Sequence, residues 1–340
     1  MRKFTLLLTL SVPTLFQPLT AFASDHINSQ NVSTIHGDVG LAFSSGKYSS
    51  NFIASDEGDS SAVSNGLNRA PSDESYTKTT PLLDLNYTIG STDTSLFLSS
   101  QTGDPLSQES YVSIGAEQVI GRFGTLSTAY LFSIPGSNKE WADPYATNHK
   151  RSSTDTRSQG VSVGWQQILG SQLSASFTHI EKKLDQERGG DSLSELSTSQ
   201  RNMLDRNGHI DSASVSYIFA LSENQSLTPE LRYSRYGLNG SAMSHNQFGI
   251  GLTHNIAIAK YSLSNGIFWA ENKYDEDNPI YNKKSDSNEY YFSSTLTKQQ
   301  LFGFTQLTGL LSASIGKNKS DIQFFNAKNT SFEVGVAYSF

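Results

Sequence analysis

The sequence contains no cysteine, few charged residues and no long apolar run after its N-terminal stretch. Without cysteine, neither a disulfide-built secreted scaffold nor a cysteine-ligated metal site can form. A helical membrane protein needs apolar runs of about 20 residues, so this class is excluded for the rest of the chain. Charged residues make up only 17% of the 340 residues, and the net charge is −7. This charge argues against a nucleic-acid-binding protein.

The N-terminal stretch is typical of a secretory signal peptide. Arg2 and Lys3 precede an apolar run, and residues 21–23 read Ala-Phe-Ala, a small-residue cleavage site. We therefore expect residues 1–23 to be a signal peptide that is cleaved near Ala23. Residues 24–33 then form a short segment before the first predicted strand.

Apolar residues alternate with small or polar ones along most of the remaining chain. Because successive side chains of a strand point to opposite faces, such a segment has one apolar and one polar face. The pattern predicts about fourteen strands. They lie at 35–43, 83–89, 96–100, 112–117, 126–132, 161–165, 173–177, 213–219, 227–233, 248–252, 261–269, 290–297, 304–315 and 332–340.

Long and short connections between these strands alternate. The long ones include 44–80, 135–157 and 183–208, whereas 90–93 and 255–257 are short. Transmembrane barrels show this asymmetry, with short periplasmic turns and long outer loops. Lipid cannot satisfy backbone N–H and C=O groups, so strands in a membrane must close into a barrel. We predict an all-β protein, a transmembrane antiparallel β-barrel over 34–340 with both termini, including segment 24–33, in the periplasm.

The chain resembles Gram-negative outer-membrane β-barrel proteins, in particular porin-like barrels of intermediate size. The resemblance rests on the signal peptide, the alternating strands, the loop asymmetry and the terminal Phe340 preceded by Tyr338 and Val336. It implies that the protein lies in the bacterial outer membrane, among lipid and lipopolysaccharide. It also implies that Val336, Tyr338 and Phe340 form the signal read by the barrel assembly machinery. The class includes functionally unassigned families, and no motif selects one.

Polar residues on the inner face of the predicted strands are the candidate lumen-lining residues. Acids outnumber bases among them, so the lumen would favour cations or neutral polar solutes over anions. Alternatively these charges pair off, as Glu230 and Arg232 on one face of a strand could do. The candidates are His36, Asp38, Asp84, Asn86, Glu117, Glu230, Arg232, Lys260 and Glu333.

A predicted barrel of this size lies between small barrels, which side chains fill, and barrels of about 16–18 strands, which hold an aqueous channel. We therefore expect a porin-like passive channel for small polar solutes or ions. The alternative is a surface interaction or structural protein with a closed lumen. Segments 44–80 and 183–208 are long enough to fold inward as a plug. The oligomeric state stays open.

An outer-membrane hydrolase, either a lipase or a protease, is the weakest alternative. His209 with Asp211, and His179 with Glu181, could each form an oriented base, because residues two apart on a strand share a face. No serine or water-holding group joins either pair. The acidic run 275–278 lacks the spacing of an EF-hand and is expected to be a solvated loop. We therefore expect no enzyme activity, no catalytic residue, no metal site and no cofactor.

Overall fold

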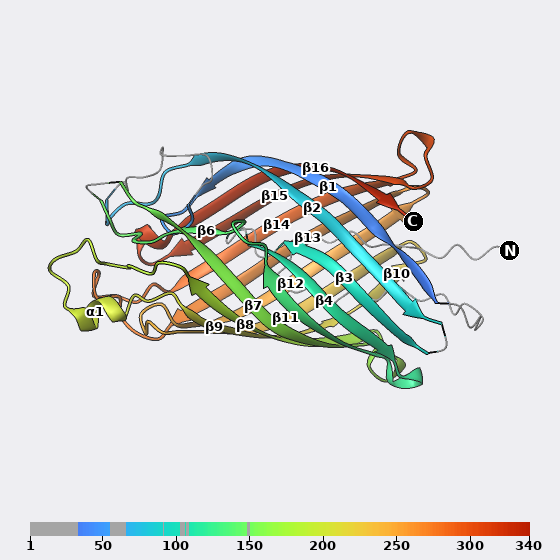
Figure 1. Ribbon diagram of the computed structural model, residues 1–340, viewed down its shortest axis with the longest axis horizontal. Coiled ribbons are helices and arrows are strands. Elements are labelled where there is room, and N and C mark those ends of the chain that lie inside the picture. Colours follow the sequence, from blue (N-terminus) through green and yellow to red (C-terminus); the bar gives the residue numbers. More distant parts are fainter. Residues whose placement is uncertain (1–32, 55–65, 91, 103–105, 107–108, 148–149) are drawn as a thin grey trace.

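The computed structural model describes residues 33–54, 66–90, 92–102, 106, 109–147 and 150–340 (Figure 1). The predicted signal peptide, 1–23, and all but the last residue of segment 24–33 lie outside these ranges. Figure 1 shows one barrel of tilted strands. Within the described ranges, no helix is both long and apolar enough to cross a membrane.

Antiparallel pairing runs around the whole barrel, and the pairing of the last strand with the first closes the sheet. Of the sixteen strands, β6 (Lys139–Trp141) lies off the closed path, and β9 and β10 form one interrupted strand that pairs with β11. Fourteen strands therefore build the barrel, which confirms the prediction. They are β1 (Thr34–Ser49), β2 (Glu74–Ile89), β3 (Thr94–Thr102), β4 (Ser110–Val119), β5 (Thr125–Ser133), β7 (Ser153–Gln166), β8 (Leu173–Leu184), β9 (Gly208–Tyr217) with β10 (Phe219–Ser222), β11 (Gln225–Leu238), β12 (His245–Ile258), β13 (Tyr261–Tyr274), β14 (Ser287–Gln299), β15 (Leu307–Ser320) and β16 (Ala327–Ser339).

The barrel is apolar on its outside. On β16, Val334, Val336 and Tyr338 are 45%, 43% and 50% exposed, whereas Gly335 and Ala337 between them are buried. A similar alternation holds on the other strands, so apolar side chains cover the outer face. The interior is lined mostly by small or polar side chains, with a few large apolar ones such as Phe97, Leu131 and Leu310. A closed sheet with an apolar outer face is the architecture of a transmembrane β-barrel. The predicted fold class is confirmed.

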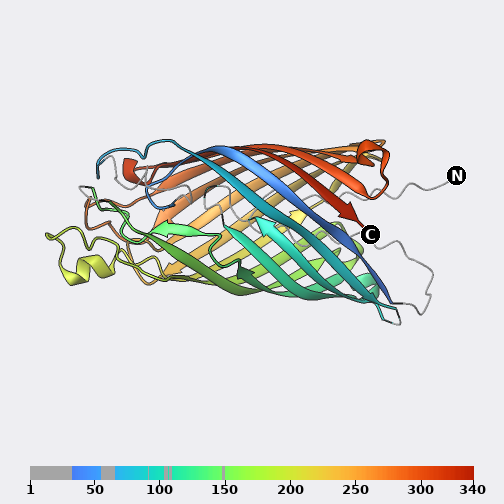
Figure 2. The same ribbon diagram turned by 45° about the horizontal axis from the view of Figure 1, so that its top comes forward.

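The two ends of the barrel differ, and they are called the turn end and the loop end here. At the turn end β1 begins and β16 ends, and Gly37 and Phe340 exchange backbone hydrogen bonds of 3.2 and 3.1 Å. The long connections and helix α1 (Thr198–Asn202) lie at the loop end (Figures 1 and 2). The chain therefore separates its short turns from its long loops, as the sequence predicts.

Most strands extend beyond their predicted ends. β1 reaches Ser49 instead of Phe43, and β12 reaches Ile258. The short turn predicted at 255–257 is in fact formed by Ala259 and Lys260, with Ala259 at a φ of +54°. Backbone pairing continues past the apolar band because ladder hydrogen bonds do not depend on side-chain polarity. Alternation of apolar residues therefore marks the lipid-facing part of each strand and underestimates its length.

Candidate functional site

The inner wall of the barrel carries hydroxyl groups that bond across neighbouring strands. The Ser212 hydroxyl donates to Ser234 at 2.8 Å, and the Ser176 and Ser214 hydroxyls lie 2.9 Å apart. Hydroxyls both donate and accept, so such a wall can solvate neutral polar solutes without selecting a sign of charge. Further pairs join Ser99 to Ser113, Ser162 to Thr178, Thr295 to Ser312 and Ser314 to Ser331.

Several predicted lumen residues lie together near the turn end. Asp38 on β1 is directly opposite Asp84 on β2, and His36 is directly opposite Asn86. The Asn86 side-chain amide donates to Asp84 Oδ1 at 2.8 Å, and the Ser339 hydroxyl donates to Asp38. Hydrogen bonds from neutral donors thus hold two facing carboxylates. This part of the inner wall carries negative charge.

Two more of the predicted carboxylates also have hydroxyl neighbours. Glu117 on β4 is directly opposite Ser127 on β5. Glu333 on β16 is directly opposite Ser312 on β15. Both alternate with outward apolar residues of their own strands. Hydroxyl groups, which can donate to a carboxylate, therefore flank each of them.

The remaining candidates behave differently. Arg232 donates to Glu230 through Nε at 2.9 Å, and its guanidinium carbon lies 5.0 Å from the centre of the Phe268 ring. Glu230 and Arg232 therefore neutralise each other. This pairing is the alternative to a charged lumen wall that the sequence left open. Lys260 lies in the exposed turn between β12 and β13, at the rim and not within a strand. Lys260 lies in the turn because β12 extends to Ile258, beyond its predicted end, and β13 begins only at Tyr261.

At the loop end, apolar side chains from many connections pack into one core, called the loop cap here. Tyr145 and Phe324 are fully buried and stack with ring centres 5.2 Å apart. Phe52 packs against Phe325 with ring centres 4.9 Å apart. The loop cap consists of Tyr145, Leu193, Leu196, Leu204, Met243, Ile322, Phe324 and Phe325, with Phe52, Leu67, Leu238, Ile280 and Tyr281 packed against it.

The members of the loop cap come from all around the barrel. They belong to the connections that follow β1, β5, β8, β11, β13 and β15. Loops from opposite sides of a barrel can meet in one core only by crossing over the lumen. Burial raises the pKa of the Tyr145 phenol above its ordinary value, which agrees with a dry core. The loop cap therefore covers the mouth of the lumen at the loop end.

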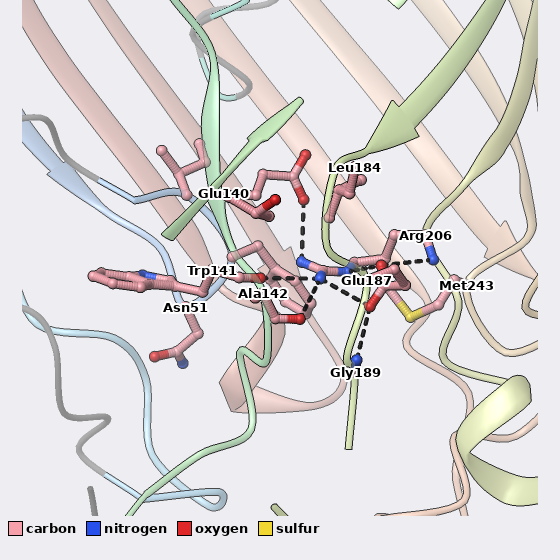
Figure 3. Close-up of polar contacts among 12 residues, drawn as sticks. Asn51, Glu140, Trp141, Ala142, Leu184, Glu187, Gly189, Arg206 and Met243 are labelled. Carbon is pink, nitrogen blue, oxygen red and sulfur yellow. Dashed lines mark hydrogen bonds and ion pairs between the residues drawn. The ribbon is translucent and has the colours of Figure 1, made fainter. Parts of the chain in front are cut away.

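A buried ion-pair network centred on Arg206 connects loops of the loop cap to one another (Figure 3). Arg206 donates through Nε to Glu187 Oε2 at 2.8 Å and through Nη1 to Glu140 Oε2 at 3.1 Å. Its Nη2 atom donates to the backbone carbonyls of Trp141 and Ala142 at 2.9 and 3.0 Å. One guanidinium thus joins the connection after β8 to the connection after β5.

The network also reaches the barrel wall. Lys182, near the loop end of β8, places Nζ 2.6 Å from Glu140 Oε1. Burial opposes ionisation of Glu140, but Lys182 and Arg206 outweigh it and hold the pKa of this carboxyl below its ordinary value. Glu140 is therefore an ionised link between the wall and the loop cap.

The connection after β1 is tied into the same structure. Ile53 forms an isolated bridge with Glu140 of β6, and β6 pairs with β7 beyond the closed sheet. Asn51 donates through Nδ2 to the Phe324 carbonyl at 3.0 Å. Arg151 donates to the Asn51 carbonyl at 3.2 Å and lies 4.3 Å from the centre of the Trp141 ring. Backbone and side-chain contacts together hold this loop across the mouth.

Sequence reasoning predicted that segments 44–80 and 183–208 could fold inward, and described residues of both contribute to the loop cap. It did not predict the packed core itself, because the loops read as hydrophilic overall. Two local signals were available. Phe324 and Phe325 are adjacent apolar residues inside a loop, and Ser197 with Gln200 forms a capping box at α1.

The candidate hydrolase residues lie on the outer face of the barrel. His179 Nδ1 is 2.6 Å from Asp211 Oδ1, and His209 Nε2 is 3.6 Å from Asp211 Oδ2. Asp211 is thus shared by two histidines, while Glu181 accepts instead from Gln159 at 3.2 Å. The predicted pairing of His179 with Glu181 does not form.

The acidic run 275–278 is engaged in protein contacts. Asp275 accepts from Arg235 Nη1 at 2.8 Å, and this hydrogen bond holds the pKa of Asp275 below its ordinary value. Asn278 is fully buried and pairs with Lys283 through an isolated bridge. Across the described ranges, no cluster of three or more histidine or acidic side chains is arranged to hold a metal ion.

Comparison with known proteins gives one family match. A family model described as "Protein of unknown function (DUF2860)" matches residues 35–339. No curated protein matches the chain. Similar solved structures include a Pseudomonas aeruginosa FadL homologue, with 10% identity, a TM-score of 0.47 and 90% of each chain covered. The outer membrane channel DcaP of Acinetobacter baumannii has 9% identity and a TM-score of 0.43, over 91% of this chain and 97% of the other.

A third similar structure is OmpT, an outer membrane protein of Vibrio cholerae, with 8% identity and a TM-score of 0.41 over 93% of this chain and all of the other. At such low identity these likenesses say nothing about what the chain binds. The assignment of the chain to a class of membrane protein rests on its closed sheet and on the apolar outer face of that sheet. By that architecture it is a transmembrane β-barrel of the outer-membrane type, as the sequence predicts.

Proposed function

The chain belongs to the family described as "Protein of unknown function (DUF2860)", and we propose that it is a porin-like passive channel for small polar solutes or ions. The observation that carries this proposal is the inner wall of hydroxyls and carboxylates. In a barrel of fourteen strands such a wall borders a polar interior. We propose that the loop cap closes the outer mouth of this channel and that transport requires it to move.

The carboxylates near the turn end support selectivity for cations or neutral solutes. Asp38 and Asp84 face each other with neutral hydrogen-bond donors beside them. Rings of carboxylates favour cations in channels. The ion pair of Glu230 with Arg232 is neutral overall, so it leaves this excess of negative charge unchanged.

We also propose the orientation and partners that the sequence predicts. The turn end, with both ends of the sheet, faces the periplasm, and the loop end faces outside. Lipid and lipopolysaccharide surround the barrel, and the barrel assembly machinery inserts it. Catalysis is not part of this proposal. His179 and His209 both lie beside Asp211 on the outer face of the barrel, with ring nitrogens 2.6 and 3.6 Å from its carboxylate oxygens.

A second function is favoured by the loop cap itself. If its apolar core never opens, the protein is a closed barrel whose loops serve surface interactions or structure. The core residues Tyr145, Leu204 and Phe324 are fully buried, which fits either function. The two functions differ in one property, namely whether ions cross the barrel.

Planar-bilayer conductance of the purified full-length protein tests this difference. We expect discrete openings of the natural protein, and a higher open fraction for Phe324→Ala, which removes a fully buried ring from the loop cap. Phe302→Ala is the matched control, because Phe302 is 83% exposed at the turn end. Met243→Ala serves as a second cap variant.

Folding of each variant is checked by its heat-dependent mobility on a gel. If the folded natural protein and the folded cap variants all show no conductance, the proposal of a channel is wrong. The protein is then a closed barrel. If Phe302→Ala opens the barrel as much as Phe324→Ala, the loop cap is not the closure.

A further inference from the structure

We propose that four lysines on the outer face of the barrel bind the phosphate groups of lipopolysaccharide. They are Lys47 on β1, Lys317 and Lys319 on β15, and Lys328 on β16, and they are called the lysine patch here. All four side chains are exposed, and they lie near the loop end of three adjacent strands.

The strand register concentrates this positive charge around Lys328. Lys328 is directly opposite Lys317 on β15. Lys47 is directly opposite Thr330, two residues along the same face from Lys328. Lys319 is two residues from Lys317 and is likewise a diagonal neighbour of Lys328. Like charges directly opposite on adjacent strands destabilise a sheet. A bound anion would remove this repulsion between the lysine side chains.

Several other cations at the loop end have carboxylate partners. Lys273 lies 3.0 Å from Glu271 and 3.2 Å from Asp286, and Arg235 lies 2.5 Å from Asp275. Within the described part of the chain, none of the four patch lysines forms an ion pair with a carboxylate. The charge of the lysine patch is therefore left for an external anion.

The position of the lysine patch identifies the anion. On the same three strands, toward the turn end, Phe43, Ile315 and Phe332 are 53%, 44% and 52% exposed. They belong to the apolar outer face of the barrel. The ammonium groups therefore lie at the membrane interface, the level of charged lipid headgroups. Lysine binds phosphate as a point charge. With the loop end outside, as proposed above, the phosphates at this level belong to lipopolysaccharide.

The test titrates refolded full-length protein in detergent with lipid A, with dephosphorylated lipid A and with inorganic phosphate. We expect lipid A to bind more tightly than its dephosphorylated form. The double variant Lys317→Gln with Lys328→Gln should raise the Kd for lipid A about 30-fold, because it removes two interfacial charges. Lys273→Gln is the matched control and should change the Kd less than about twofold, because Lys273 is already paired.

The inference is overturned if the double variant binds lipid A as tightly as the natural protein, or if dephosphorylated lipid A binds equally well. Inorganic phosphate binding as tightly as lipid A would show a free-anion site and would also overturn it. Lys47→Gln with Lys319→Gln replaces the double variant if the latter does not fold. Binding in detergent does not require conductance, so the lysine patch and the proposed channel can fail separately.

Discussion

Arg206 and Glu187 form a buried ion pair within the connection after β8, with Nε 2.8 Å from Oε2 and side-chain exposures of 4% and 11%. Removing one partner of such a pair leaves the other charged and buried, which costs about 3–5 kcal/mol. We expect Arg206→Ala to lower the free energy of opening of the loop cap by this amount. Amide hydrogen exchange of residues 185–207 should then accelerate about 100-fold or more.

The control for this prediction is Arg157→Ala. Arg157 also forms an ion pair, with Asp185 at 2.8 Å, but its side chain is 72% exposed. Exposed pairs contribute at most about 1 kcal/mol. Equal exchange rates in the two variants would show that the Arg206 network does not hold the loop cap.

Acid should loosen the loop cap. The pKa of Glu140 is held below its ordinary value because Lys182 and Arg206 outweigh the cost of burial. A carboxyl group of this kind contributes stability above its ordinary pKa and loses it as pH falls through the lowered value. We therefore expect the loop cap to be intact near neutral pH and to become protease-sensitive below about pH 4.

The variant Glu140→Gln isolates this effect. It keeps the shape of the side chain but cannot ionise, so its loops should be protease-sensitive near neutral pH and change less on acidification. Limited proteolysis across the pH range measures both. If the natural protein and Glu140→Gln show the same pH profile, another group controls the acid response.

The barrel could be predicted from sequence because most of its lipid-facing strands repeat the same two-residue alternation. β16 is the clearest case, since Phe332, Val334 and Val336 all lie on the outer face. Strand number and loop asymmetry follow from counting such segments. Strand ends do not, because pairing continues into polar sequence, and Lys260 was consequently placed on a strand and not in a turn.

The loop cap could not be predicted, for a physical reason. Its core joins Phe52, Leu204 and Phe324, which are far apart in the sequence and follow no shared period. The contacts depend on where the barrel places each loop. The same holds for Arg206, whose partners Glu140 and Glu187 belong to two different connections.

The charge of the lumen gives a further prediction. Asp84 faces Asp38, so Asp84→Asn removes a charge from a facing pair of carboxylates. We expect weaker cation selectivity, seen as a smaller reversal potential in a salt gradient, with stability unchanged or raised because like charges oppose each other. Glu271→Gln is the control, since Glu271 pairs with Lys273 near the loop end. Equal shifts from both variants would place selectivity outside the lumen.

Phe340 should act in assembly and not in stability. Phe340 exchanges backbone hydrogen bonds of 3.2 and 3.1 Å with Gly37, and the residue is 49% exposed on the lipid side. Phe340→Ala keeps the backbone bonds and removes the ring that the assembly machinery is predicted to read. We expect several-fold less folded protein in the outer membrane of cells, but unchanged refolding of the purified chain in detergent. Phe340→Tyr, which keeps an aromatic ring, should restore the cellular amount. If refolding falls as much as cellular assembly, the ring stabilises the closed barrel and is not a signal.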